Sequence, residues 1–140
     1  MAYSLNDVYR FLRIVMRLNG ATVGLGLGLL LLAAAKGDLA AWGVFSGGPI
    51  WPVRMAGGLL AALGVTLLLA AQERIVSGPS MVGMSLANAL LAGVLLLAYL
   101  QQEFVMLNLS GRLLLVGIFV MCLIGAIFPL RYVRAEYVSH

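Results

Sequence analysis

Four long apolar runs without any charged side chain dominate this sequence. They cover residues 21–35, 55–71, 81–100 and 113–130, which together make up half of the 140 residues. An α-helix rises about 1.5 Å per residue, so roughly 20 residues cross the ~30 Å hydrocarbon core of a bilayer. The runs therefore predict an all-α integral membrane protein, in which four transmembrane helices run alternately up and down as one bundle.

The composition indicates a single membrane domain over residues 1–140. Hydrophobic residues make up 63% of the chain and its mean hydropathy is +1.06, which is too apolar for a soluble domain. We expect spans near 18–35, 55–72, 81–100 and 112–130, with an amphipathic helix start over 4–19. Gly78 and Pro79 should end one helix, and Ser80 and Ser110 could cap the next two.

The basic residues predict the orientation of the spans. Six of the nine Lys and Arg residues fall on the side shared by the N-terminus, the second loop and the C-terminus, and three fall on the other. The positive-inside rule then places both termini in the cytoplasm, most naturally at a bacterial inner membrane. Because these residues flank the spans, they indicate topology and lipid-headgroup contact rather than a nucleic-acid surface.

Several residues near the span ends are candidates for contact with lipid headgroups or with a partner. Arg10, Arg13 and Arg17 share one face of the first helix, where they could anchor the span or dock an acidic partner. The first loop, 36–54, carries tryptophans, which prefer the membrane–water boundary. We expect this loop to lie flat on the outer face. Its candidate contact residues are Trp42, Trp51 and Arg54.

Small residues recur at helical spacing in the spans, where they allow helix backbones to approach closely. Two interpretations remain open: these faces pack against each other inside the bundle, or one face, that of the first span above all, meets another subunit. The candidate packing or partner-interface residues are Gly20, Gly24, Gly28, Gly57, Gly58, Ser85, Ala89 and Gly93.

The sequence lacks the residues that most membrane chemistry requires. The one histidine is His140 and the one cysteine is Cys122, so no metal cluster or disulfide-exchanging pair can form. No span carries an acid or base, so we expect neither catalysis nor an intrinsic cofactor. Asn88 is the most polar side chain at depth. Its amide either bonds another helix or contacts a quinone, a pigment or a solute.

One part of the chain resembles a known family. The stretch 49–54 (PIWPVR), followed by the Gly-rich 55–64 (MAGGLLAALG), is similar to the second span of small bacterial DoxX-like membrane proteins. The Gly-rich first span and the four-span layout extend the resemblance over roughly 20–130. It implies a four-helix fold. Some members of that group are subunits of quinone-linked oxidoreductases, and Arg54 is the position that the resemblance marks.

Two functions follow as expectations. The first is a non-catalytic accessory subunit that packs through Gly-rich faces in a larger membrane complex, for example a respiratory or photosynthetic one. Its partners would be other integral membrane subunits and lipids, with any quinone or pigment held only at an interface with them. The alternative is a DoxX-like protein that binds or transports a neutral lipophile, such as a quinone, between the second and third spans.

Overall fold

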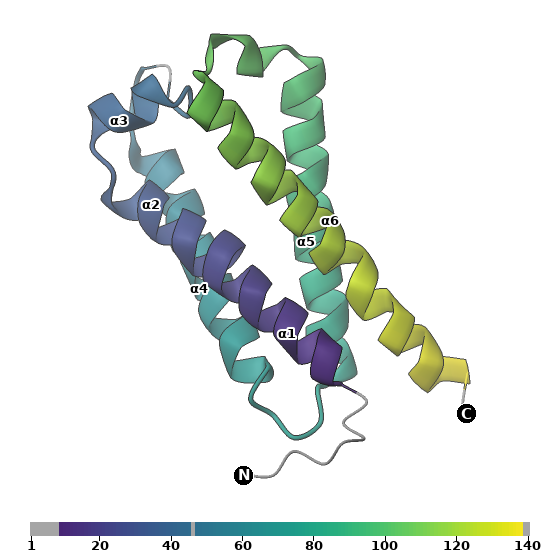
Figure 1. Ribbon diagram of the computed structural model, residues 1–140. Helices are drawn as coiled ribbons and strands as arrows, with labels where there is room; N and C mark the ends of the chain where they lie inside the picture. Colours follow the sequence, from purple (N-terminus) through teal and green to yellow (C-terminus); the bar gives the residue numbers. More distant parts are fainter. Residues whose placement is uncertain (1–8, 46, 139–140) are drawn as a thin grey trace.

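The computed structural model describes residues 9–45 and 47–138, and these residues contain helices and no β-strand (Figure 1). Four helical stretches are long and apolar enough to cross a membrane: Arg10–Ala33, Trp51–Ala70, Gly78–Leu100 and Leu109–Arg134. Consecutive stretches run in opposite directions. The all-α class and the four candidate spans expected from the apolar runs are confirmed.

The first span consists of three consecutive helical segments, and short helices occupy two of the connections. A π-helix forms the middle of the first span, beginning where the sequence changes from Asn19 to Gly20. The elements in chain order are α1 (Arg10–Asn19), η1 (Gly20–Leu27), α2 (Gly28–Ala33), α3 (Lys36–Ala41), α4 (Trp51–Ala70), α5 (Gly78–Leu100), η2 (Glu103–Met106) and α6 (Leu109–Val138).

The four spans pair into two antiparallel hairpins. In one hairpin α4 packs along η1 and α2, and in the other α5 packs along α6 (Figure 1). The hairpins meet mainly through α1 and α6, whereas α4 and α5 barely touch. The four spans therefore do not pack equally closely against one another, as they would in the single bundle that the apolar runs predict.

The largest core cluster lies where α1 meets the α4–α5 connection. It is built from apolar side chains that are at most 8% exposed: Leu12, Met16, Leu67, Ala70, Ala71, Val76, Met81 and Met84. Elsewhere, large apolar side chains of all four spans face outward, including Leu29, Leu59, Leu90 and Leu113, each more than half exposed. Outward-facing apolar side chains on every span are what a lipid environment favours.

Two helix ends differ from the expected positions. The helix α4 begins at Trp51, since Pro52 is compatible with a first helical turn. The helix α6 continues through the buried Pro129 to Val138, because Tyr132 packs against Tyr9 and Phe128 and so holds the last turns on the core. The helix start expected at residues 4–8 lies outside the described residues.

The helix caps also differ from the expected ones. Ser77 caps α5 by accepting a hydrogen bond from the Ser80 N–H at 3.4 Å, and the Gly78–Pro79 pair forms the first turn of α5 instead of ending a helix. Asn108 Oδ1 accepts from the Gly111 N–H at 2.8 Å, so Asn108 fills the position expected for Ser110. In both cases the residue immediately before the helix supplies the acceptor, as the geometry of an N-cap requires.

Candidate functional site

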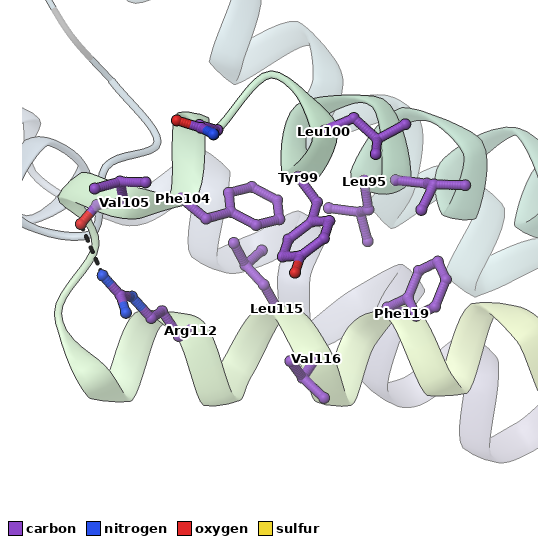
Figure 2. Close-up of a pocket in the computed structure, with 11 residues that line it drawn as sticks. Leu95, Tyr99, Leu100, Phe104, Val105, Arg112, Leu115, Val116 and Phe119 are labelled. Carbon is purple, nitrogen blue, oxygen red and sulfur yellow. Dashed lines mark hydrogen bonds between the residues drawn. The ribbon is translucent and has the colours of Figure 1, made fainter.

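A cavity lies between α5 and α6, next to η2, which connects them (Figure 2). It has a volume of about 810 Å³ and is partly open. Apolar and aromatic side chains form most of its wall, and three polar side chains lie at the η2 end. The lining residues are Leu95, Leu96, Tyr99, Leu100, Gln102, Phe104, Val105, Arg112, Leu115, Val116 and Phe119.

A tight connection closes one end of this cavity. Gln102 has a φ of 60°, in the left-handed region, and this reverses the chain between α5 and η2. The reversal brings the Phe104 ring to 6.4 Å from the Tyr99 ring, in a tilted arrangement that Figure 2 shows above α6. A non-glycine residue in this conformation costs roughly 1–2 kcal/mol. The connection therefore holds a defined shape at some expense in stability.

Arg112 links this connection to α6. Its Nε donates to the Leu107 carbonyl oxygen at 3.2 Å. Its Nη2 donates to the Val105 carbonyl oxygen at 2.7 Å, a bond that Figure 2 shows. These bonds fix the guanidinium at the end of a mostly apolar cavity. Within the part of the chain that the structure describes, Arg112 forms no ion pair.

A second, smaller groove separates the two hairpins. It has a volume of about 570 Å³ and lies between η1–α2 and α6, with Gly26 and Gly117 in its wall. Its one hydroxyl, on Thr22, donates to the Leu18 carbonyl oxygen at 2.6 Å and is therefore used within its own helix. This groove offers packing surface and no free polar group to orient a ligand, so the α5–α6 cavity is the better candidate site.

Asn88 lies in a buried amide pair with Asn19. Each side chain donates to the other, at 2.9 Å from Asn19 Nδ2 and 3.1 Å from Asn88 Nδ2. The second N–H of each amide reaches a carbonyl oxygen, that of Met121 for Asn19 and that of Met84 for Asn88. All four amide N–H donors are thus used within the protein, three of them between helices and one within α5, which favours the packing interpretation of Asn88 over ligand contact.

Gly125 makes room for this amide pair. A Cβ at Gly125 would lie 2.7 Å from Asn19 Nδ2 and 2.8 Å from Asn88 Cγ, closer than side-chain carbons normally approach. The junction therefore joins three helices: α1 and α5 supply the amides, and α6 supplies the glycine against which they pack. It lies where the two hairpins meet.

Arg54 caps the end of the first span. From the first turn of α4, its Nη1 donates to the carbonyl oxygens of Leu31 and Leu32, and its Nη2 donates to that of Ala34 at 2.8 Å. The last carbonyl groups of a helix lack intrahelical hydrogen-bond partners and carry partial negative charge. A guanidinium supplies both the missing hydrogen-bond donors and a positive charge. Arg54 therefore has a specific structural role within the first hairpin.

We expect Arg54→Gln to destabilise the protein by about 1.5–3 kcal/mol, because hydrogen bonds from a charged group are lost at the end of α2. Arg54→Lys keeps the charge without the planar fork and should lie between Gln and wild type. Unfolding by denaturing detergent, followed by circular dichroism, measures both. Lys36→Gln, at an exposed position near the same end, is the control. Equal losses for Arg54→Gln and Lys36→Gln would contradict the capping role.

The glycines of the first span face inward. A Cβ on Gly24 would lie 2.2 Å from the Gly64 Cα, and one on Gly28 would lie 2.6 Å from the Ala61 backbone nitrogen. A Cβ on Gly20 would lie 3.0 Å from the Gly64 carbonyl oxygen, and one on Gly57 would lie 2.8 Å from the Gly28 carbonyl oxygen. The structure thus uses this small-residue face within the first hairpin, and the face is not available to a partner in this arrangement.

The remaining candidates on the small-residue faces lie elsewhere. A Cβ added to Gly58 or to Gly93 would meet nothing within 4 Å, and Ala89 is exposed. Ser85 is buried on α5, and its hydroxyl has no hydrogen-bond partner within the described residues. Hence α5 presents an outward face with small side chains, which no described element covers.

The aromatic and basic candidates are divided between the surface and internal contacts. Arg13 is half-buried, and its Nη2 donates to the carbonyl oxygens of Glu73 and Arg74, at 3.0 and 2.6 Å, which ties α1 to the α4–α5 connection. Trp42 is half-buried beside α3. The candidates at exposed positions are Arg10, Arg17 and Trp51.

The sequence pattern did not single out Asn19, Gly64 or Arg112. Asn19 stands two residues before the first apolar run. Gly64 follows Gly57 at a spacing of seven and Ala61 at three, a pattern that could have identified the inward face of α4. Nothing in the sequence marked Arg112 as a cavity residue, since arginines are common at the ends of membrane spans.

Comparison with known proteins assigns no relative to this chain. No family model, curated protein or solved structure matches it. The resemblance to DoxX-like proteins therefore stays a prediction. Among the described residues, no group of three or more His, Cys, Asp or Glu side chains is close enough to hold a metal ion.

Proposed function

We propose that this protein binds a lipophilic molecule in the α5–α6 cavity and acts by binding instead of catalysis. The observation that carries this proposal is the cavity itself, which has a volume of about 810 Å³, is partly open, and has a mostly apolar wall with polar side chains at one end. Ligand sites typically combine a mostly apolar wall with a few placed polar groups. Here Arg112, Tyr99 and Gln102 supply those groups.

The proposed site differs in place from the expected one. The sequence suggested a lipophile site between the second and third spans, but α4 and α5 barely touch and the cavity lies between the third and fourth spans, so we place the proposed site there. Lining residues such as Leu100 and Val116 are exposed on the outer faces of α5 and α6, so a ligand dissolved in a bilayer could reach the cavity without crossing the headgroup layer. With both termini in the cytoplasm of a bacterial inner membrane, as the basic residues predict, the site would face the outer leaflet.

An accessory subunit of a larger membrane complex is the second candidate. The glycine face of the first span supports it less than the sequence suggested, since Gly24 and Gly28 are occupied by α4. What favours it is the outward face of α5, where Ala89 and Gly93 would let a neighbouring helix approach closely. A partner on this face would lie beside the cavity.

We expect Val116→Trp to remove the ligand that co-purifies with the wild-type protein, because the larger side chain fills the cavity. Val94→Trp is the matched control: Val94 is 62% exposed and Val116 60% exposed, but Val94 does not line the cavity. The measurement is mass spectrometry of lipophiles extracted after gentle solubilisation, expressed as moles per mole of protein.

A lipophile that remains at the same stoichiometry in Val116→Trp would contradict binding in this cavity. If instead the wild-type protein co-purifies with other membrane subunits, and Gly93→Leu releases them while Val116→Trp does not, the accessory-subunit function is supported. Maleimide labelling of the buried Cys122 checks that each variant is folded.

A further inference from the structure

Arg112 gives the cavity a net positive end. Two of its donors are held by the carbonyl oxygens of Val105 and Leu107, while Nη1 has no bonding partner within the described residues. Arg112 also lies in the first turn of α6, a turn with no acidic residue. The partial positive charge of a helix N-terminus adds to that of the guanidinium, so this position favours an anion.

The acidic side chains of the described residues do not neutralise this charge. None of them lines the cavity, and Glu103, nearest in sequence, is exposed and forms no ion pair with Arg112. The cavity also offers no carboxylate to receive an ammonium group. In a headgroup that carries both charges, the phosphate could therefore pair with Arg112, but the cation would find no carboxylate in the cavity.

The rest of the wall requires a long apolar group. From Arg112 the cavity follows Leu115, Val116 and Phe119 along α6, opposite Leu95 of α5 (Figure 2). A free phosphate ion would bury none of this apolar surface, and a neutral lipophile would leave the guanidinium without an anion. The wall and the arginine together fit a molecule with a negative head and a hydrocarbon chain.

We propose that the ligand is an acidic phospholipid, whose phosphate lies on Arg112 and whose acyl chain lies between α5 and α6. This inference rests on the proposed function and names its ligand class. The phosphate oxygens would accept from Nη1, while the bonds to Val105 and Leu107 keep the guanidinium in place. Tyr99 and Gln102 line the same end and can bond the glycerol region.

Native mass spectrometry of the full chain with two lipids of identical acyl chains tests the proposal. We expect phosphatidylglycerol to bind about five- to tenfold more tightly than phosphatidylcholine, as one arginine near a headgroup provides. Arg112→Gln should abolish this preference and Arg112→Lys should keep part of it. Arg131→Gln, which removes an exposed arginine of α6 outside the cavity, should keep all of it. Inorganic phosphate should not compete.

The outcomes distinguish a wrong ligand class from a wrong binding site. Equal binding of the two lipids by the wild-type protein, with both weakened by Val116→Trp, would overturn the acidic-lipid proposal and leave lipophile binding standing. No saturable binding of either lipid, together with no effect of Val116→Trp on co-purified lipophile, would overturn both. Because the wild-type comparison uses no variant, a folding defect in Arg112→Gln cannot decide the test.

Discussion

Gly24→Ala should destabilise the protein by at least about 2 kcal/mol, the largest effect expected of any single methyl group in this chain. The added Cβ would lie 2.2 Å from the Gly64 Cα and 2.7 Å from the Gly64 nitrogen. Both neighbours are backbone atoms and cannot rotate away, so the two helices must separate along η1 and α4. Unfolding by denaturing detergent measures the loss.

The neighbouring glycines Gly57 and Gly58 provide a matched control on one helix. A Cβ at Gly57 would lie 2.8 Å from the Gly28 carbonyl oxygen, whereas one at Gly58 would meet nothing within 4 Å. Gly57→Ala should therefore destabilise by about 1–3 kcal/mol. Gly58→Ala should be neutral, or stabilising by up to about 1 kcal/mol, because alanine favours a helix over glycine. Equal effects at the two positions would contradict the inward face of α4.

Breaking the Asn19–Asn88 pair should also destabilise the protein strongly. Asn88→Ala leaves the Asn19 carbonyl oxygen without its donor, and Asn19→Ala does the same to Asn88. Each single change should cost about 1–3 kcal/mol, since a buried polar group then loses its partner. The double variant should cost less than the sum, with a coupling of about 0.6–2 kcal/mol.

Asn108→Ala supplies the additive control for this cycle. It removes the Asn108 cap of α6, several turns from Gly125, and shares no hydrogen bond with Asn19. Its cost of about 1 kcal/mol should add to that of Asn19→Ala within about 0.5 kcal/mol. Additive costs for Asn19→Ala and Asn88→Ala would show that the amides act independently.

The reaction of Cys122 with a maleimide gives a second readout for these variants. It is the single cysteine of the chain, it is fully buried, and it packs with Val23 of η1 and Ala92 of α5. Separation of the hairpins would expose it. Its rate of labelling in mild detergent should therefore rise in Asn88→Ala, which removes a contact between the hairpins, and stay low in Gly58→Ala.

The sequence predicted the features that depend on single segments. The absence of charge over 20 residues such as 81–100 is a local property, and it indicates a span whatever the neighbours are. Asn88 was recognised as a polar group that requires a partner, for the same reason. The α5 cap at Ser77 and the start of α4 at Trp51 were misplaced by a few residues, because several adjacent residues can fill those roles.

The features that depend on pairing could not be predicted in this way. The spacing of Gly20, Gly24 and Gly28 is the same whether the opposite helix is α4 or a partner, and only the three-dimensional arrangement brings Gly64 against them. The α5–α6 cavity likewise requires that Gln102 reverse the chain and that Arg112 bond η2. Neither contact leaves a periodic pattern in the sequence.

The structure of the protein in a lipid nanodisc, determined by electron microscopy with a bound antibody fragment, tests the proposed binding site most directly. We expect continuous non-protein density that begins at the Arg112 guanidinium and follows α6 to Phe119. An α5–α6 pair closed over an empty cavity, or density only on the outward face of α5 from another helix, would contradict a lipophile-binding function.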